Sequence, residues 1–409
     1  MRVGKFIVVV LDGFGIGAMD DVERVRPADI GSNTCTHIFD AVPNLHLPNL
    51  ACLGLANAVG FSYKGLPTSC SATYGAARLT HFWADTFFAH QEIMGTKPHM
   101  PRGEAINDGH LDLVARALRE AGFHVERHAK DSLGYLVIDG ACTVADNIEC
   151  DPGQAINVTA ALEDMPFSRE LEVGRIVRDI VHAPRVITFG GGGIHLNDLL
   201  EAVEVHGRYI GVNAPSSGVY KAGYQCVHMG YGVDERVQVP YLLGSAGIPV
   251  HLIGKVADVC ANAYGASEPM VDTYNVLSRA IEMAELPGPR FICANVQETD
   301  LAGHSQDAGR FADRLQVADE RIGVLRDAMD EDDLLIVMAD HGNDPTIGHP
   351  HHTRERVPLL IAGRHIRSGY VGERETLSDV GATACDFFSV KLPENGTSFL
   401  SSLNVSIPQ

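Results

Sequence analysis

Five side chains of the types that bind metal ions lie close together near the end of the sequence. Asp340 and His341 directly follow an apolar run, 334–338, which predicts a buried strand. Three more histidines come within the next eleven residues: His349, His351 and His352. Carboxylate oxygens and imidazole nitrogens are ligands of zinc and other divalent metals. Because open α/β sheets bind ligands at the carboxyl ends of their strands, we expect a metal site here.

Two other apolar runs end in the same residue types. The run 6–11 leads to Asp12, and the run 291–296 leads to Asp300 and His304, four residues apart. The glycines that follow Asp12 have the spacing Gly-x-Gly-x-Gly, which lacks the Gly-x-Gly-x-x-Gly pattern of a dinucleotide-binding turn. Asp12 could be a plain turn residue. We favour a metal ligand, because Asp340 ends a strand in the same way.

The rest of the chain alternates apolar runs with amphipathic helical patterns. The clearest helical patterns are 110–121, 172–181 and 309–326. A further helix is expected over 47–59, with Gly54 weakening its middle. This alternation predicts an α/β fold with a central, mostly parallel sheet flanked by helices. The pattern changes near residue 101, which predicts a smaller α/β domain, 101–224, inserted into a core domain of 1–100 and 225–409.

Composition excludes several classes of protein. The 409 residues carry a formal charge of −20, whereas a nucleic-acid surface would be basic. No apolar run is long enough for a membrane span, and the N-terminus does not read as a secretory signal. The nine cysteines form no Cys-x-x-Cys pair, which fits reduced thiols in a cytoplasmic protein.

Four consecutive glycines, 190–193, precede a helical pattern at 196–205. A glycine run at the start of a helix can bind phosphate through its backbone N–H groups. It can equally be a mobile loop, and the sequence leaves both interpretations open.

The chain resembles the phosphopentomutases, within the alkaline-phosphatase-like metalloenzymes. The resemblance is most specific in Ala-Asp-His-Gly-Asn-Asp-Pro at 339–345 and His-Thr-Arg-Glu at 352–355. It also covers 11–19, 31–34, Asp85 with Thr86, 90–95, 253–255, 300–304, 381–383 and 396–400. The resemblance implies an alkaline-phosphatase-like α/β core with an inserted cap domain. It also implies two divalent metal ions, usually Mn²⁺, with Zn²⁺ or Mg²⁺ as alternatives.

The resemblance also implies a role for individual residues. Thr86 would carry the phosphate. One metal would be held by Asp12, Asp340 and His341, and the other by Asp300, His304 and His352, with His351 as the rival of His352. Asp146 and Lys255 match the family and would contact the substrate. Gly191 and Gly192 lie where the family has phosphate-binding cations, and their backbone N–H groups could bind the substrate phosphate instead.

Two differences from the family affect the part of the site that is expected to bind the substrate. Ala84 stands where family members usually have Lys, and Phe189 stands where they have a phosphate-binding Arg. We expect a phosphopentomutase-like isomerase that transfers phosphate on a sugar phosphate through a phosphothreonine. The alternatives are a metal-dependent phosphoester hydrolase acting on another small phosphorylated substrate and a non-catalytic metal-binding protein. No nucleic acid or membrane partner is expected, and the oligomeric state stays open.

Overall fold

The computed structural model describes residues 4–150 and 152–403 and divides into two compact units. The core unit comprises Met1–Pro98 and Asp234–Gln409, and the insert unit comprises His99–Val233. The inserted domain expected at 101–224 lies within the insert unit. No helix of the described residues is long and apolar enough to cross a lipid bilayer.

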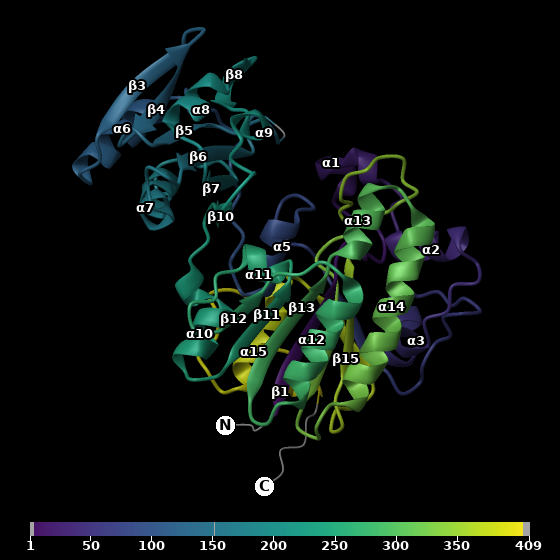
Figure 1. The fold of residues 1–409 in the computed structure, drawn as a ribbon. Coiled ribbons are helices and arrows are strands. Elements are labelled where there is room, and N and C mark those ends of the chain that lie inside the picture. Colours follow the sequence, from purple (N-terminus) through teal and green to yellow (C-terminus); the bar gives the residue numbers. More distant parts are fainter. Residues whose placement is uncertain (1–3, 151, 404–409) are drawn as a thin grey trace. The chain divides into compact units, whose positions relative to one another are not determined.

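An eight-stranded sheet forms the centre of the core unit, in the order β12-β11-β13-β1-β14-β15-β2-β16 (Figure 1). Its strands are β1 (Lys5–Leu11), β2 (Thr73–Ala77), β11 (Val250–Gly254), β12 (Ala266–Glu268), β13 (Arg290–Val296), β14 (Leu334–Met338), β15 (Val357–Ala362) and β16 (Gly369–Arg374). All neighbours pair in parallel except β15, which runs antiparallel to both β14 and β2. The expected mostly parallel sheet is confirmed.

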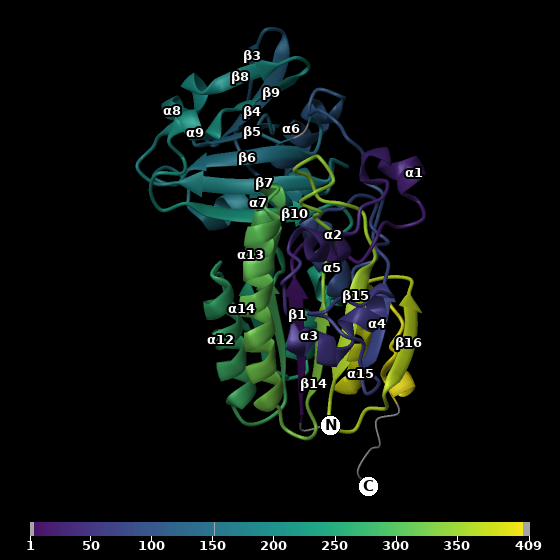
Figure 2. The same cartoon turned by 90° about the vertical axis from the view of Figure 1, so that its right-hand side faces the viewer.

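Helices cover both faces of this sheet. They are α1 (Val22–Val25), α2 (Thr34–Ala41), α3 (Pro48–Leu53), α4 (Leu55–Val59), α5 (Thr86–Ile93), α10 (Val239–Ser245), α11 (Val256–Val259), α12 (Thr273–Glu285), α13 (Glu298–His304), α14 (Ala308–Asp327) and α15 (Ser378–Phe387). Short 3₁₀ turns lie at Pro27–Asp29, Glu235–Val237 and Leu400–Leu403. Figure 2 shows α12 and α14 on one side of the sheet and α15 on the other. Coverage on both faces explains why every residue of β1 and β14 is buried.

The helix expected over 47–59 is divided in two by Gly54. This residue has φ +95° and ends α3 before α4 begins. A Cβ at this position would lie 2.6 Å from the Cβ of Ala72, so the close approach also requires glycine. The expectation of one weakened helix was therefore wrong, because Gly54 adopts the left-handed conformation that ends a helix.

The insert unit has its own sheet and its own apolar core. Its six strands lie in the order β10-β7-β6-β5-β4-β3, and only β6 and β7 pair in parallel. Its strands are β3 (Val125–Lys130), β4 (Leu133–Ile138), β5 (Cys142–Asp146), β6 (Ala155–Ala161), β7 (Arg185–Gly191) and β10 (Gln225–Gly230), with β8 (Val203–His206) and β9 (Tyr209–Val212) forming a separate pair. Its helices are α6 (His110–Glu120), α7 (Phe167–Arg178), α8 (Leu196–Glu201) and α9 (Ala214–Ser217).

Candidate metal centre

Three neighbouring parallel strands bring the candidate ligands together. β1 lies between β13 and β14, so the carboxyl ends of all three meet at one edge of the sheet. Asp12 follows β1, while Asp340 and His341 follow β14. Asp300 lies on α13, the short helix that follows β13. The convergence expected from the sequence is therefore present in the structure.

The first group of ligands consists of Asp12, Asp340 and His341, whose candidate ligand atoms all lie within 4.8 Å of one another. All three side chains are fully buried. Nε2 of His341 lies 3.6 Å from Oδ1 of Asp12 and 3.3 Å from Oδ2 of Asp340. Nδ1 of His341 donates to the Gly342 carbonyl at 3.0 Å, which leaves a lone pair on Nε2. The ring is thus oriented as a ligand.

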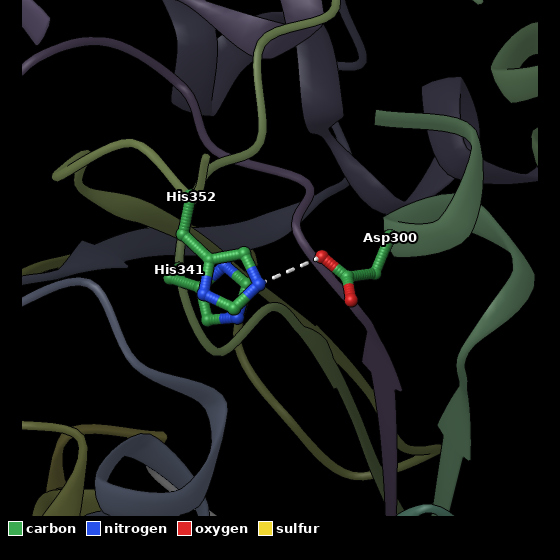
Figure 3. Close-up of side chains that lie close together, drawn as sticks. All are labelled: Asp300, His341 and His352. Atoms are coloured by element: carbon green, nitrogen blue, oxygen red, sulfur yellow. Dashed lines mark ion pairs between the residues drawn. The ribbon is translucent and has the colours of Figure 1, made fainter. Parts of the chain in front are cut away.

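The second group consists of Asp300, His341 and His352 (Figure 3). Nε2 of His352 lies 3.3 Å from Oδ1 of Asp300, and its ring stacks on that of His341 with centroids 3.9 Å apart. His304 adjoins this group, with Nε2 3.3 Å from Oδ2 of Asp300 and 3.0 Å from Nε2 of His352. His351, the rival candidate, is exposed and lies against the ring of His349.

The donor set of the second group fits a cation. Nδ1 of His304 donates to the Pro350 carbonyl at 2.7 Å, and Nδ1 of His352 donates to the Ala84 carbonyl at 3.0 Å. Both Nε2 atoms therefore present lone pairs to each other at 3.0 Å, an arrangement that a positive charge between them would stabilise. Metal-binding histidines are typically oriented in this way by a hydrogen bond from the other ring nitrogen.

The first group fits a cation for a different reason. Among the described residues, Oδ1 of Asp12 and Oδ2 of Asp340 are buried without a hydrogen-bond partner, and Oδ2 of Asp12 lies 3.1 Å from the Lys255 ammonium. Burial, together with the charge of Asp340, raises the pKa of Asp12 to about 6. Burial, with His352 nearby, lowers the pKa of His341 to about 3. A bound divalent cation would relieve the repulsion between the carboxylates and favour the neutral imidazole that ligation requires.

Thr86 lies at the junction of the two groups. Its hydroxyl donates to Nε2 of His341 at 2.6 Å and accepts from Nζ of Lys255 at 3.1 Å. The Lys255 ammonium also lies 3.1 Å from Oδ2 of Asp12 and 3.2 Å from Oδ2 of Asp300, so it contacts both groups. Burial alone would lower the pKa of Lys255, but Asp12 and Asp300 raise it above its ordinary value.

A short helix, α13, holds Asp300 and His304 together. On α13 they are four residues apart and share one face. Gly303 has a packing role, because a Cβ there would lie 2.4 Å from Cγ of Asn343. The Asn343 amide in turn donates to Oδ1 of Asp300 at 2.8 Å. Sequence reasoning missed this role of Asn343, because nothing in its spacing shows that it turns back to α13.

Three substrate candidates in the insert unit already have partners within that unit. Both carboxylate oxygens of Asp146 accept backbone N–H groups, from Ile106 at 2.6 Å and Ile210 at 2.9 Å, and the side chain is fully buried. A Cβ at Gly191 would lie 2.0 Å from the Val219 carbonyl oxygen. The N–H of Gly192 donates to the Ala222 carbonyl at 2.8 Å. Close packing therefore accounts for Gly191, and the N–H donor of Gly192 is occupied.

Comparison with known proteins places the chain in a family. A profile of the Metalloenzyme superfamily matches residues 4–392. The phosphopentomutase of Herpetosiphon aurantiacus is 30% identical over 418 residues, covering 98% of this chain and 100% of the relative. That of Kosmotoga olearia is 29% identical over 411 residues, covering 97% and 98%. A solved phosphoglycerate mutase of Leishmania mexicana aligns with a TM-score of 0.44 at 15% identity, covering 97% of each chain. The chain therefore belongs to the Metalloenzyme superfamily and, within it, to the phosphopentomutase family.

Proposed function

We propose that this chain is a metal-dependent phosphomutase that acts on a sugar phosphate through Thr86. The observation that carries the proposal is the position of the Thr86 hydroxyl, within hydrogen-bond distance of both His341 and Lys255. Phospho-Thr86 would pass its phosphoryl group to a sugar monophosphate. The resulting bisphosphate would return its other phosphate to Thr86, so that the phosphate changes position on the sugar without net hydrolysis.

The proposed ion sites are Asp12, Asp340 and His341 for one divalent ion and Asp300, His304 and His352 for the other. Bound there, the ions would neutralise phosphate charge and lower the pKa of the Thr86 hydroxyl. Membership of the phosphopentomutase family supports Mn²⁺ first, with Zn²⁺ or Mg²⁺ as alternatives, because carboxylates and imidazoles bind all three ions. The nine cysteines of the sequence form no Cys-x-x-Cys pair, which supports a cytoplasmic location.

The protein supplies the remaining positioning. Thr86 is the first residue of α5, where the helix dipole favours a phosphate. Asp85 fixes this helix start by accepting the N–H of Phe88 at 3.0 Å. Lys255 would bind a phosphoryl oxygen, since its ammonium already contacts Oγ1 of Thr86. Positioning and charge neutralisation are the main requirements of phosphoryl transfer.

The test is incubation with ribose 1-phosphate, Mn²⁺ and a sugar bisphosphate primer. We expect ribose 5-phosphate without free phosphate. Release of free phosphate alone would instead indicate a hydrolase, and the absence of both products would exclude ribose phosphate as the substrate.

A matched pair of threonine variants tests the role of Thr86. Thr86→Ala should abolish phosphoryl transfer while the bound metal stays nearly unchanged. Thr68→Ala, at an exposed position of the core unit, serves as the control and should retain full activity. Full activity in Thr86→Ala would remove Thr86 from the mechanism.

A further inference from the structure

The segment 79–84, which leads directly to Asp85 and Thr86, is held from one side by Glu92. This carboxylate is fully buried on α5. It accepts the backbone N–H groups of Thr80, at 3.1 Å, and His81, also at 3.1 Å. Nδ1 of the His81 ring donates to Oε2 of Glu92 at 2.7 Å. The helix that begins with Thr86 therefore holds the amides of the segment that precedes it.

Arg354 holds the carbonyl groups of the same segment from the other side. Its guanidinium donates to the carbonyls of Leu79 at 3.1 Å, His81 at 2.6 Å and Trp83 at 3.1 Å. Its remaining donors form a two-point contact with Asp21, at 2.9 and 3.0 Å. These bonds use all five N–H groups of the guanidinium. The side chain is only 5% exposed, so these bonds are shielded from water.

The position of Arg354 in the chain connects these hydrogen bonds to the metal centre. Two residues before it, His352 donates from Nδ1 to the Ala84 carbonyl at 3.0 Å. Residues 352–354 thus donate to the carbonyl groups of four residues in segment 79–84. The same three residues include His352, a candidate metal ligand. A shift of this segment would move Thr86 relative to His352.

We propose that Arg354 is a positioning residue, which fixes the Thr86 hydroxyl at the distance from the metal ligands that phosphoryl transfer requires. The inference rests on the proposed function, because it needs Thr86 as the phosphate carrier. Lysine cannot replace arginine here, since a single ammonium cannot reach three carbonyls and a carboxylate at once. A displacement of about 1 Å in a reacting group can lower the rate by about 100-fold.

The chain contains its own probe of the segment. Trp83 is the only tryptophan in the sequence, so intrinsic tryptophan fluorescence reports on segment 79–84 alone. In metal-loaded protein, Arg354→Lys should increase acrylamide quenching of Trp83 and lower its anisotropy. Arg356→Lys is the matched control. Arg356 lies two residues further along, is half-exposed, and contacts Glu373 at 3.5 Å.

The kinetic readout separates positioning from general damage to the fold. Arg354→Lys should lower kcat by about 10- to 100-fold, with KM and bound metal unchanged. It should also increase the share of free phosphate among the products, because water then competes with a displaced Thr86. Partial unfolding would lower all products in proportion. If Arg354→Lys fails to fold, Asp21→Asn should show the same changes more weakly, because Arg354 is kept but loses the carboxylate that orients it.

Each outcome decides the matter. Unchanged Trp83 quenching would show that Arg354 does not hold segment 79–84 in place. Increased quenching with normal kcat and product share would overturn the positioning role. If the wild-type protein transfers no phosphate from any sugar phosphate, the proposed function and the positioning role both fail. The fluorescence comparison would still decide whether Arg354 holds the segment.

Discussion

Two adjacent histidines, His351 and His352, differ completely in their surroundings. His352 is largely buried beside Asp300, whereas His351 is exposed. We expect His352→Ala to lose about one equivalent of bound metal, because the second group then lacks an oriented imidazole. His351→Ala should keep the full metal content. Elemental analysis after dialysis would measure both, and metal loss in His351→Ala alone would reverse the assignment.

A buried carboxyl in the insert unit should make stability depend on pH. Burial raises the pKa of Glu170 from 4.5 to about 8. Between these values the folded protein holds a proton that the unfolded chain has released, so stability falls as pH rises, by about 1.4 kcal/mol per pH unit at most. Glu170→Gln should therefore stabilise the protein at pH 8 and change little near pH 4.5.

Denaturant unfolding at the two pH values would measure this difference. Glu172→Gln is the control, because Glu172 lies on the same helix but is exposed and paired with Arg169. An equal pH slope in wild type and Glu170→Gln would show that Glu170 is ionised throughout.

At the residue scale, the sequence predicted where a side chain lies in the fold better than it predicted which groups surround that side chain. Asp12, Asp340 and His341 could be placed because they come just after apolar runs, and a strand end has a defined location in a parallel sheet. Asp146 is the last residue of a strand, β5, yet its carboxylate is buried against two backbone N–H groups. The residues that use an aspartate as an internal acceptor lie far away in sequence, so no local pattern could distinguish the two cases.

At the element scale, the short helix α13 fixes the distance between Asp300 and the strands. Gly303→Ala should disturb it, because the added Cβ would lie 2.4 Å from the Asn343 side chain, which itself binds Asp300. We expect a loss of about 1–3 kcal/mol in stability together with weaker metal binding.

Gly309→Ala, near the start of α14, provides the control, since its nearest neighbour would be 3.4 Å away. Thermal unfolding with and without metal would compare the two variants. Equal metal affinity in both would show that α13 tolerates the shift.

The elements were predictable where one local signal dominated. The apolar run 334–338 matches β14 residue for residue. Asn33, a residue type that commonly caps helices, precedes α2 and accepts the N–H of Thr36 at 3.1 Å. The direction of β15 was not predictable, because an apolar run has the same composition in either orientation. Only its pairing with β14 and β2 defines the direction.

At the scale of the whole molecule, each unit has a separate apolar core. Both proposed ion sites lie in the core unit, within 1–98 and 234–409. Ligands that bind only the folded state stabilise the part of the structure that contains their site. Metal should therefore stabilise the two units unequally, which gives a test of where the ions bind.

We expect Mn²⁺ to raise the unfolding temperature of the core unit and to leave that of the insert unit unchanged. An ion at 100 times its Kd contributes about 2.7 kcal/mol. Trp83 lies in the core unit, so its fluorescence follows that transition, whereas calorimetry detects both. In His352→Ala the response to metal should be smaller, because one site has lost a ligand. If chelation shifted two separate transitions equally, the assignment of all six ligands to the core unit would fail.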